Sequence, residues 1–390
     1  MGAIRRSFAA ITGLAAAPAA ALAVGLAAAL AAVTPAASAA QPASQQSASA
    51  ASLTAVSCPA ATWCMAVGSY TTRSGGQHAL AQIWNGRTWQ VRKPPGPSLT
   101  SVSCTATWFC LAAGGPTGVE QWNGTSWREI PGPQGATTAP ACGSRSWCVV
   151  VNGSIKHPAE SFAETWNGHR WRTWWEDTNV CSQNGPGLYG YPCALTAVAC
   201  GGPANCVTVG YSSAYPGVEE PPTQVPAGYS WNGQHWALAA LPNLPFLITE
   251  VSCAGTFCLG VDGASVNGTG AATWNAKTRT WTVLNSHFGC GPGPNNCGDV
   301  YALSCASATS CLVFSRFSGN QFWNGSTWRP APSIGAGKGS LLGAVSCHAA
   351  GPGGTACLAV GHQTHNGVRR TLAELWNGTT WKILATPNIA

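Results

Sequence analysis

The sequence has little charge. Asp, Glu, Lys and Arg together make up 8% of its 390 residues, and only 12 residues are acidic. This composition excludes a coiled coil, a disordered chain and long amphipathic helices, which all need many charged residues. No basic run is long enough to mark a nucleic-acid footprint, so no nucleic-acid partner is expected. The abundant residues are Gly, Pro, Trp and Cys, with 47, 27, 19 and 18 copies.

Zinc-type cysteine spacing is also missing, since no two cysteines are separated by two residues anywhere in the chain. The eight histidines are scattered without the spacing of metal ligands. We therefore expect no metal and no cofactor. The even number of cysteines instead favours disulfides, formed in an oxidising compartment.

Residues 1–40 have the composition of a signal peptide. Arg5 and Arg6 precede a long Ala-rich apolar run that ends in small residues near Ala40. The arginine pair also matches a twin-arginine signal, so either export route is open. An uncleaved membrane anchor is the alternative, because the run is long enough to span a bilayer. Cleavage predicts a secreted, extracellular or cell-wall-associated protein without stable membrane insertion, which begins with a flexible linker over residues 41–52.

Residues 53–390 contain seven copies of one unit. Each copy holds Trp-Asn-Gly and a second Trp, usually five residues after the first, as in "LAQIWNGRTW" at residues 80–89; the fifth copy reads Trp-Asn-Ala. Asn-Gly between apolar runs is a hairpin signal, and we expect a type I′ turn in which both residues have positive φ. The tryptophan pairs are Trp84 and Trp89, Trp122 and Trp127, Trp166 and Trp171, Trp231 and Trp236, Trp274 and Trp281, Trp323 and Trp328, and Trp376 and Trp381.

A cysteine pair precedes each of these turns, with a β-like run such as "LTAVS" before the first cysteine and "MAVGSY" after the second. Each unit therefore predicts four short strands. Facing residues of an antiparallel pair lie close enough for a disulfide, so each cysteine pair is expected to join the first two strands. The predicted disulfides of the repeat are Cys58–Cys64, Cys104–Cys110, Cys142–Cys148, Cys200–Cys206, Cys253–Cys258, Cys305–Cys311 and Cys347–Cys357.

Four strands per unit are typical of a propeller blade, and so is the spacing of first cysteines, from 38 residues (Cys104 to Cys142) to 58 (Cys142 to Cys200). A solenoid would need capping units, whereas the last unit, "LAELWNGTTWKIL", is as regular as any other. We predict an all-β, seven-bladed β-propeller of four-stranded antiparallel blades, with no strand exchanged between the termini. The repeated tryptophans would pack between blades. A ring of sugar-stacking tryptophans is the alternative.

Units of the form "LTAVSC…CMAVGSY…LAQIWNGRTW" resemble those of secreted, cysteine-rich Trp-Asn-Gly repeat proteins of actinobacteria, over nearly all of residues 53–390. The resemblance implies a propeller similar in appearance to kelch-like and Asp-box propellers. The turn "NGRTW" lacks the Asp of the Asp-box. The resemblance implies a fold, and it implies no established activity.

Length variation is expected at the propeller end opposite the cysteine and Asn-Gly turns. Three long loops belong there, at residues 173–194, 211–228 and 285–299, and Cys181–Cys193 and Cys290–Cys297 would pin the first and the third. The first two loops concentrate aromatic and acidic residues, which suit a sugar or a protein partner. The predicted ligand-binding residues are Trp174, Trp175, Glu176, Asp177, Tyr189, Tyr191, Tyr211, Tyr215, Glu219 and Glu220.

These features predict a non-catalytic, monomeric binding scaffold whose long-loop end recognises a glycan or an extracellular protein. A glycan-active hydrolase or lyase on the same propeller is the alternative. Glu176 and Asp177 are adjacent, however, and would point to opposite faces of a strand rather than act as paired carboxylates. We therefore assign no catalytic residue. A structural cell-envelope component, in which the aromatic residues only pack the loops, is the third possibility.

Overall fold

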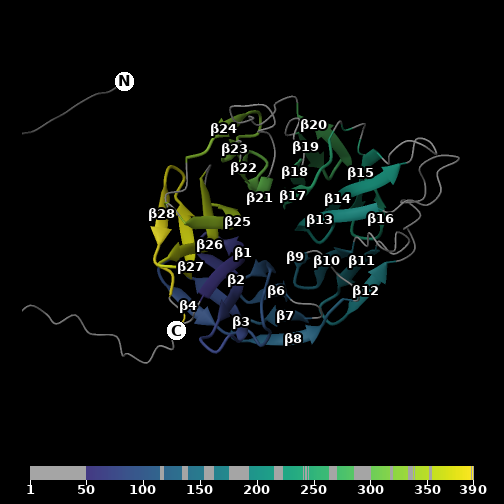
Figure 1. The fold of residues 1–390 in the computed structure, drawn as a ribbon. Coiled ribbons are helices and arrows are strands. Elements are labelled where there is room, and N and C mark those ends of the chain that lie inside the picture. Colours follow the sequence, from purple (N-terminus) through teal and green to yellow (C-terminus); the bar gives the residue numbers. More distant parts are fainter. Residues whose placement is uncertain are drawn as a thin grey trace, which may run out of the picture. The chain divides into compact units, whose positions relative to one another are not determined.

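The computed structural model describes residues 50–114, 118–133, 139–152, 162–174, 193–214, 223–239, 241, 244, 246–262, 270–284, 300–316, 319–332, 337, 339–350, 354–387 and 389. In this part of the chain every regular element is a β-strand, and we find no helix long and apolar enough to cross a bilayer. The strands form seven four-stranded antiparallel sheets, arranged as blades around a central axis (Figure 1). The predicted seven-bladed propeller is confirmed.

Each blade is one sequence unit, with its first strand nearest the axis and its fourth strand at the rim. Blade 1 contains β1 (Ala50–Ala60), β2 (Trp63–Thr71), β3 (Gln77–Trp84) and β4 (Trp89–Arg92). Blade 2 contains β5 (Ser101–Ala106), β6 (Phe109–Gly114), β7 (Gly118–Trp122) and β8 (Trp127–Pro131). Blade 3 contains β9 (Ala141–Ser144), β10 (Trp147–Asn152), β11 (Phe162–Trp166) and β12 (Trp171–Trp174). Blade 4 contains β13 (Cys193–Gly202), β14 (Asn205–Ala214), β15 (Thr223–Trp231) and β16 (Trp236–Leu238).

Blade 5 contains β17 (Glu250–Ala254), β18 (Phe257–Val261), β19 (Ala271–Asn275) and β20 (Thr280–Val283). Blade 6 contains β21 (Val300–Ser307), β22 (Ser310–Ser315), β23 (Gln321–Trp323) and β24 (Trp328–Pro330). Blade 7 contains β25 (Ser340–Ala349), β26 (Thr355–His365), β27 (Val368–Trp376) and β28 (Trp381–Leu384). Every sheet keeps its four strands in sequence order, so no strand is exchanged between the first and last blades, as predicted.

The core is divided into seven apolar clusters, one at each interface between neighbouring blades. The first tryptophan of each repeat pair is at most 6% exposed and packs in the cluster shared with the preceding blade. Its partner lies directly across the strand pair, with ring centroids 5.3–5.7 Å apart. Burial of large side chains at alternate positions of a strand explains the repeat. The fourteen tryptophans are therefore packing residues, not a sugar-stacking ring.

Each cysteine pair of the repeat forms the predicted disulfide between the first and second strands, with Cα atoms 3.9–4.1 Å apart. No cysteine is free among the described residues. Since each bond closes a loop of few residues, it contributes about 2 kcal/mol on the chain-entropy account. Each disulfide therefore stabilises its own blade and does not join one blade to another.

The Trp-Asn-Gly turns of the repeat differ from the predicted type I′ turn. In these turns glycine alone takes positive φ, as at Gly86 (90°), and Asn85 does not. The Oδ1 of Asn85 instead accepts hydrogen bonds from the backbone N–H groups of Arg87 (3.0 Å) and Thr88 (2.8 Å). The same pattern recurs at the other Trp-Asn-Gly turns, for example at Asn377. The prediction was wrong because the Asn side-chain oxygen accepts the backbone hydrogen bonds of the turn. The paired tryptophans are therefore joined by a four-residue loop.

A belt of hydrogen bonds joins the first strands around the axis. The serine before the first cysteine of one blade accepts a hydrogen bond from the backbone N–H of the first cysteine of the next. Ser57 pairs in this way with Cys104 at 2.9 Å. The same bond occurs from Cys142 to Ser103, from Cys305 to Ser252, from Cys347 to Ser304, and from Cys58 to Ser346. The last of these closes the ring between blades 7 and 1.

The C-terminal residues complete this closure. Ile389 is 8% exposed and packs in the cluster that contains Leu53 of blade 1 and Val360 of blade 7. Gln82 of blade 1 donates from Nε2 to the carbonyl oxygen of Pro387 at 3.3 Å. The tail thus occupies the place that a connection between blades takes elsewhere in the ring, and no shared sheet is needed to hold the two ends of the chain together.

Candidate functional site

The two ends of the propeller differ in construction. At the turn end, each blade presents its cysteine turn, between strands one and two, and its Asn turn, between strands three and four. At the loop end lie the connections between strands two and three and between successive blades. The sequence places every long connection at the loop end, so this end is where the candidate site was predicted.

Most of the predicted site lies outside the described residues. This holds for Trp175, Glu176, Asp177, Tyr189, Tyr191, Tyr215, Glu219 and Glu220, and for Cys181, Cys290 and Cys297. Cys193 begins β13, but its side chain is not among those described. A binding role for these residues and the two loop disulfides stay predictions.

Trp174, at the end of β12, is a described member of the predicted site. Its Nε1 donates to Thr165 Oγ1 at 2.8 Å, and its ring meets the ring of Trp231 edge-on at a centroid distance of 5.2 Å. The guanidinium of Arg172 lies 4.3 Å from the ring centroid of Trp174. The ring contact with Trp231 ties blade 3 to blade 4, and the other two contacts hold Trp174 within blade 3.

Tyr211, the second described member, lies on β14 opposite Ala194 and Pro226 and is half-buried. Side chains alternate along a strand, so Tyr211 shares the side of β14 that carries Val207 and Val209. That side packs on blade 5. Tyr211 and Trp174 both lie on strands. The sequence alone did not distinguish them from residues of the long loops.

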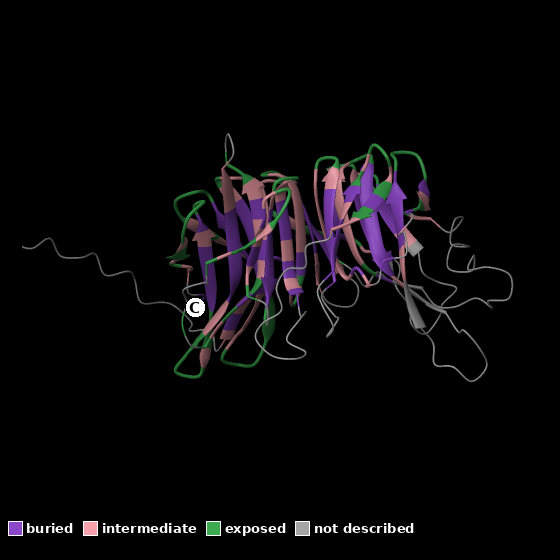
Figure 2. Cartoon of the chain, turned by 90° about the horizontal axis from the view of Figure 1, so that it is seen from above, coloured by how far each residue is buried: buried purple, intermediate pink, exposed green. Residues whose placement is uncertain are grey.

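Two hairpins of blades 1 and 7 form a further described part of the loop end. Strands β2 and β3 pair as far as Thr71 and Gln77, and β26 and β27 pair as far as His365 and Val368. Their tips are exposed, and the hairpins reach beyond the sheets on the side of the ring where the chain ends (Figure 2).

Aromatic and basic side chains lie on these hairpins. Tyr70 stacks on His78 with ring centroids 5.3 Å apart. Burial, together with the positive charge of Arg369, lowers the pKa of His362 below its usual value. In its neutral form, the imidazole of His362 can both donate and accept a hydrogen bond.

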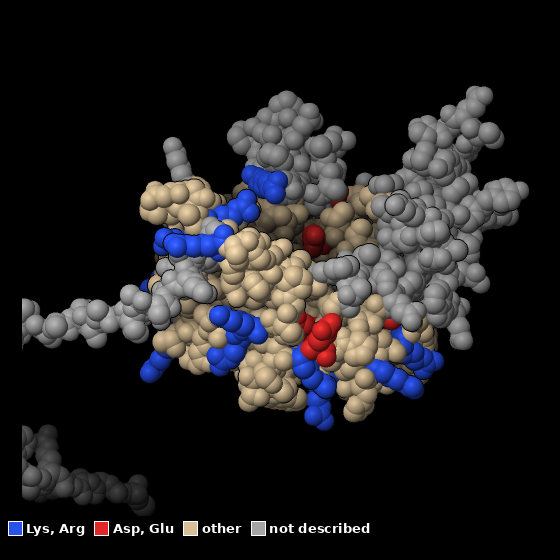
Figure 3. Space-filling model, turned by 60° about the horizontal axis from the view of Figure 1, so that its bottom comes forward, with Lys and Arg blue, Asp and Glu red and all other residues tan. Residues whose placement is uncertain are grey.

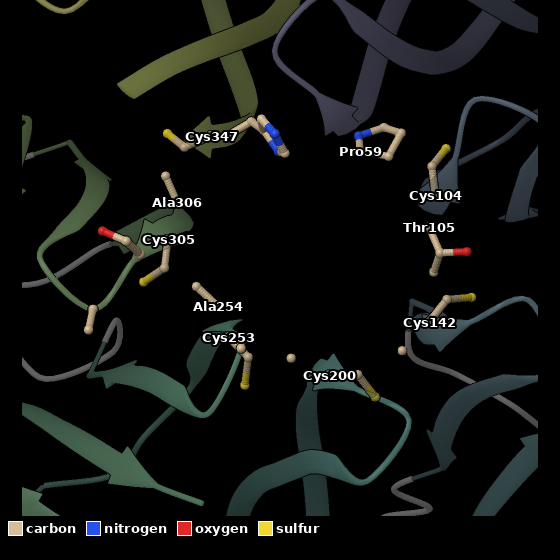
Figure 4. A pocket seen from close by; sticks show the side chains of 16 residues that line it. Pro59, Cys104, Thr105, Cys142, Cys200, Cys253, Ala254, Cys305, Ala306 and Cys347 are labelled. Carbon is tan, nitrogen blue, oxygen red and sulfur yellow. The ribbon is translucent and has the colours of Figure 1, made fainter. Parts of the chain in front are cut away.

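The turn end contains a cavity of about 540 Å³ on the propeller axis. The residue after the first cysteine of each blade lines it, with the disulfides just behind (Figure 4). These seven residues are Pro59, Thr105, Gly143, Gly201, Ala254, Ala306 and His348. His348 is the single titratable side chain among these seven residues, so they offer no pair of acid and base groups. Among the described residues no cluster of three His, Cys, Asp or Glu could hold a metal.

Buried polar residues two positions before the repeat tryptophans were missed from the sequence. Five blades carry Gln or Glu there: Gln82, Glu120, Glu164, Gln321 and Glu374. Glu120 Oε1 accepts a hydrogen bond from the backbone N–H of Gly96 at 2.8 Å, in the connection from blade 1 to blade 2. Burial raises the pKa of Glu120, the Gly96 N–H partly offsets this, and the charge of Glu129 adds to the rise. Glu120 and Gln82 thus anchor segments between blades.

Glu250 is a single carboxyl group in the innermost layer of strands. It begins β17, and five other blades have alanine at the same distance before the first cysteine, namely Ala55, Ala139, Ala197, Ala302 and Ala344. Burial raises its pKa to about 7. A carboxyl group with this pKa gains or loses its charge near neutral pH.

The described surface is strongly cationic. Glu129 is its only exposed carboxylate, because Glu120, Glu164, Asp262 and Glu374 are buried and Glu250 is half-buried. The face drawn in Figure 3 carries many more basic than acidic side chains among the residues drawn in colour. The exposed basic residues are Arg73, Arg87, Lys93, Arg128, Arg145, Arg170, Arg172, Lys277, Arg316, Arg329, Arg369, Arg370 and Lys382.

The fold and the disulfides define a class: a seven-bladed propeller whose blades are each closed by a local disulfide and whose ring is closed without strand exchange. No family model and no curated protein matches the sequence. The β-propeller domain of the Trilobed protease from Pyrococcus furiosus, described as an open velcro topology, has a TM-score of 0.51 at 9% identity, over 85% of this chain and 97% of that chain.

Two further solved structures are similar. The complex of KlAtg21 with the coiled-coil of AgAtg16 has a TM-score of 0.51 at 10% identity, over 86% of this chain and 100% of that chain. A mutant of Aleuria aurantia lectin in complex with alpha-methyl-L-fucoside has a TM-score of 0.42 at 11% identity, over 89% of this chain and 98% of that chain. At such identities these likenesses concern the fold and leave the ligand open.

Proposed function

We propose that this chain is an exported, non-catalytic binding scaffold that recognises a glycan or an extracellular protein through the loop end. One observation carries the proposal: the side chains that recur in every unit are used to hold the ring together. The repeat tryptophans fill the blade interfaces, the cysteines form disulfides within each blade, and the Asn side chains accept the hydrogen bonds of the turns. The connections at the loop end differ in length and sequence from blade to blade, so a rigid frame presents variable segments there.

The disulfides support export. Seven bonds across neighbouring strands would not persist in a reducing cytosol, so the protein is expected to work in an oxidising compartment outside it. A frame held by local staples and interblade packing also suits a binding protein, because pre-ordered loops lose less conformational entropy when they bind.

The test uses the exported protein as bait. A glycan array and a pull-down from the envelope of the secreting cell should each be run with the wild type and with a Tyr191→Ala, Tyr215→Ala double variant. Loss of aromatic anchors should weaken binding of the captured ligand at least about tenfold. Ile383→Ala, which removes an exposed apolar side chain from the outer strand β28, is the control and should bind like the wild type.

Two outcomes would overturn this proposal. Unchanged affinity in a well-folded double variant would remove the loop end of blades 3 and 4 as the site. The release of new reducing ends from a glycan incubated with the protein would instead favour the glycan-active hydrolase or lyase.

A further inference from the structure

The cysteine turns offer a site of a different kind at the turn end. In six blades the turn is two residues long: Ala61-Thr62, Thr107-Trp108, Arg145-Ser146, Pro203-Ala204, Gly255-Thr256 and Ala308-Thr309. Ten of these twelve residues are small or are proline. Only Trp108 of blade 2 and Arg145 of blade 3 carry long side chains, and both are exposed.

The two exceptions meet. Blades 2 and 3 are neighbours, and the guanidinium carbon of Arg145 lies 5.7 Å from the ring centroid of Trp108. Trp108 is nevertheless 47% exposed, whereas every repeat tryptophan is buried or half-buried. Two independent departures from a repeated pattern thus come together at one place on the surface.

The fold does not need the indole. The Cα and Cβ of Trp108 rest against Gly124 in the Asn turn of the same blade. Thr62 makes the same contact with Gly86, and Thr309 makes it with Gly325. A threonine therefore supplies the packing that this position requires. The cation–π contact with Arg145 adds only about 0.5–1 kcal/mol at an exposed site, so stability does not account for the pair.

The charge of the surroundings indicates the ligand. Arg145 has no carboxylate partner among the described residues, and the single exposed carboxylate of the described surface, Glu129, belongs to the outer strand β8. Within the described surface, which is poor in acidic groups, this guanidinium favours an anionic ligand, and its planar fork matches a carboxylate with two hydrogen bonds. The indole offers a flat apolar face beside it.

We propose that Trp108 and Arg145 form a binding subsite for an acidic saccharide, with a hexuronate as the recognised unit. One pyranose ring stacks its C–H face on the indole while its carboxylate pairs with the guanidinium. A protein partner is less favoured because two side chains on a face of short turns offer only one small anchor point. This subsite is at the end opposite the proposed loop-end site and does not depend on it.

The test is calorimetric titration of the wild type with an oligogalacturonate hexamer at low salt, with maltohexaose as the neutral counterpart. We expect the uronate to bind and the neutral hexamer to bind at least about tenfold more weakly. Trp108→Thr, which restores the residue of blades 1, 5 and 6, should weaken uronate binding about tenfold or more. Arg145→Gln should do the same and should remove the preference over maltohexaose.

Matched variants separate this subsite from general cationic attraction. Trp108→Phe keeps an aromatic face and should stay within about threefold of the wild type. Lys382→Gln removes an exposed cation from the outer strand β28 and should leave binding unchanged. The loop-end variant Tyr191→Ala, Tyr215→Ala should also bind the hexamer normally, so failure of one site is distinguishable from failure of the other.

Three results would overturn the proposal: no binding of the hexamer to the wild type; unchanged binding in folded Trp108→Thr; or equal losses in Arg145→Gln and Lys382→Gln. The last would show a diffuse cationic surface instead of a built subsite. Because threonine already occupies this place in three other blades, Trp108→Thr is expected to fold, which circular dichroism and thermal unfolding will check.

Discussion

At five blade interfaces, a cysteine N–H of one blade donates to a serine hydroxyl of the blade before it, whereas the two interfaces that flank blade 4 are built differently. Blades 3 and 4 have Ala141 and Ala199 in place of that serine, so neither can accept the bond. Their turns instead come into direct backbone contact. A Cβ on Gly143 would lie 2.4 Å from the carbonyl of Gly202, and one on Gly201 would lie 1.9 Å from the carbonyl oxygen of Gly255.

Larger side chains add to these two interfaces. Trp147 stacks on Trp231 between blades 3 and 4, with ring centroids 4.3 Å apart. Asn205 of blade 4 donates from Nδ2 to the carbonyl oxygen of Gly255 at 2.7 Å. Neighbouring blades are thus joined in one of two ways. Either a serine hydroxyl forms a hydrogen bond between them, or glycines without a Cβ allow their backbones to touch. The first kind of interface is sensitive to a lost hydroxyl, and the second to an added methyl group.

The largest effect should come from adding that methyl group. Gly201→Ala places a Cβ against backbone, which cannot move away as a flexible side chain can, and should destabilise the protein by about 3 kcal/mol or prevent folding. Gly202→Ala is the matched control, because a Cβ there meets nothing within 4 Å. Thermal unfolding compares the two. Equal stability of both variants would contradict the close-contact account of blade 4.

A pH effect is expected at the interface of blades 5 and 6. Because the pKa of Glu250 is about 7 in the folded state, above its ordinary value of 4.5, folding favours the protonated form. Its contribution to stability is fully present below pH 4.5 and is lost as pH rises through 7, by at most about 3 kcal/mol. Glu250→Ala should abolish this loss and stabilise the protein at pH 8. Denaturant unfolding at pH 5 and pH 8 measures it, and a slope that persists in the variant would refute it.

Loss of a belt hydroxyl should have a smaller effect. Ser346→Ala leaves the N–H of Cys58 without its acceptor at the interface that closes the ring, and should cost about 1–2 kcal/mol. Ser103→Ala tests the same bond away from the closure, between blades 2 and 3. Similar falls in unfolding temperature are expected. A much larger fall for Ser346→Ala would mean that ring closure depends on this bond more than on the C-terminal tail.

The smallest effect should be a gain. Ala199→Ser supplies blade 4 with the serine that it lacks, opposite the N–H of Cys253 in blade 5. If the two kinds of interface share one backbone geometry, the new bond should stabilise the protein by about 1 kcal/mol or less. Thermal unfolding in parallel with the wild type measures it. Destabilisation would show that the glycine contact holds blades 4 and 5 in a different relative position.

The architecture could be predicted from sequence because its signals are local. The spacing of Cys58 from Cys64 and of Trp84 from Trp89 defines two hairpins within one unit, and seven repetitions define the ring. The positive φ predicted for Asn85 was wrong, because hydrogen bonds to its side-chain oxygen determine the conformation of that turn. The belt from Ser346 to Cys58 was missed as well, since it joins residues 288 positions apart.

The candidate sites show the same limit. Trp108 and Arg145 each look like an ordinary turn residue within its own unit, and only the placement of blade 2 beside blade 3 brings them together. A comparison of the six two-residue turns would have singled out both residues, but not their contact. Trp174 lies at the end of β12 and packs on Trp231, a contact that its place in the sequence did not reveal, and its role near a ligand stays a prediction.

The local disulfides have a consequence for how this protein matures. Each bond joins cysteines only 5, 6 or 10 residues apart, so every pair can oxidise as soon as its own hairpin has formed. No repeat cysteine has to wait for a distant partner, and the register of the hairpin selects the correct thiol over its many competitors. Oxidation can therefore proceed blade by blade as the hairpins form. The docking of Ile389 between blades 7 and 1 needs both ends of the ring, so we expect closure of the ring to follow the oxidation of the hairpins.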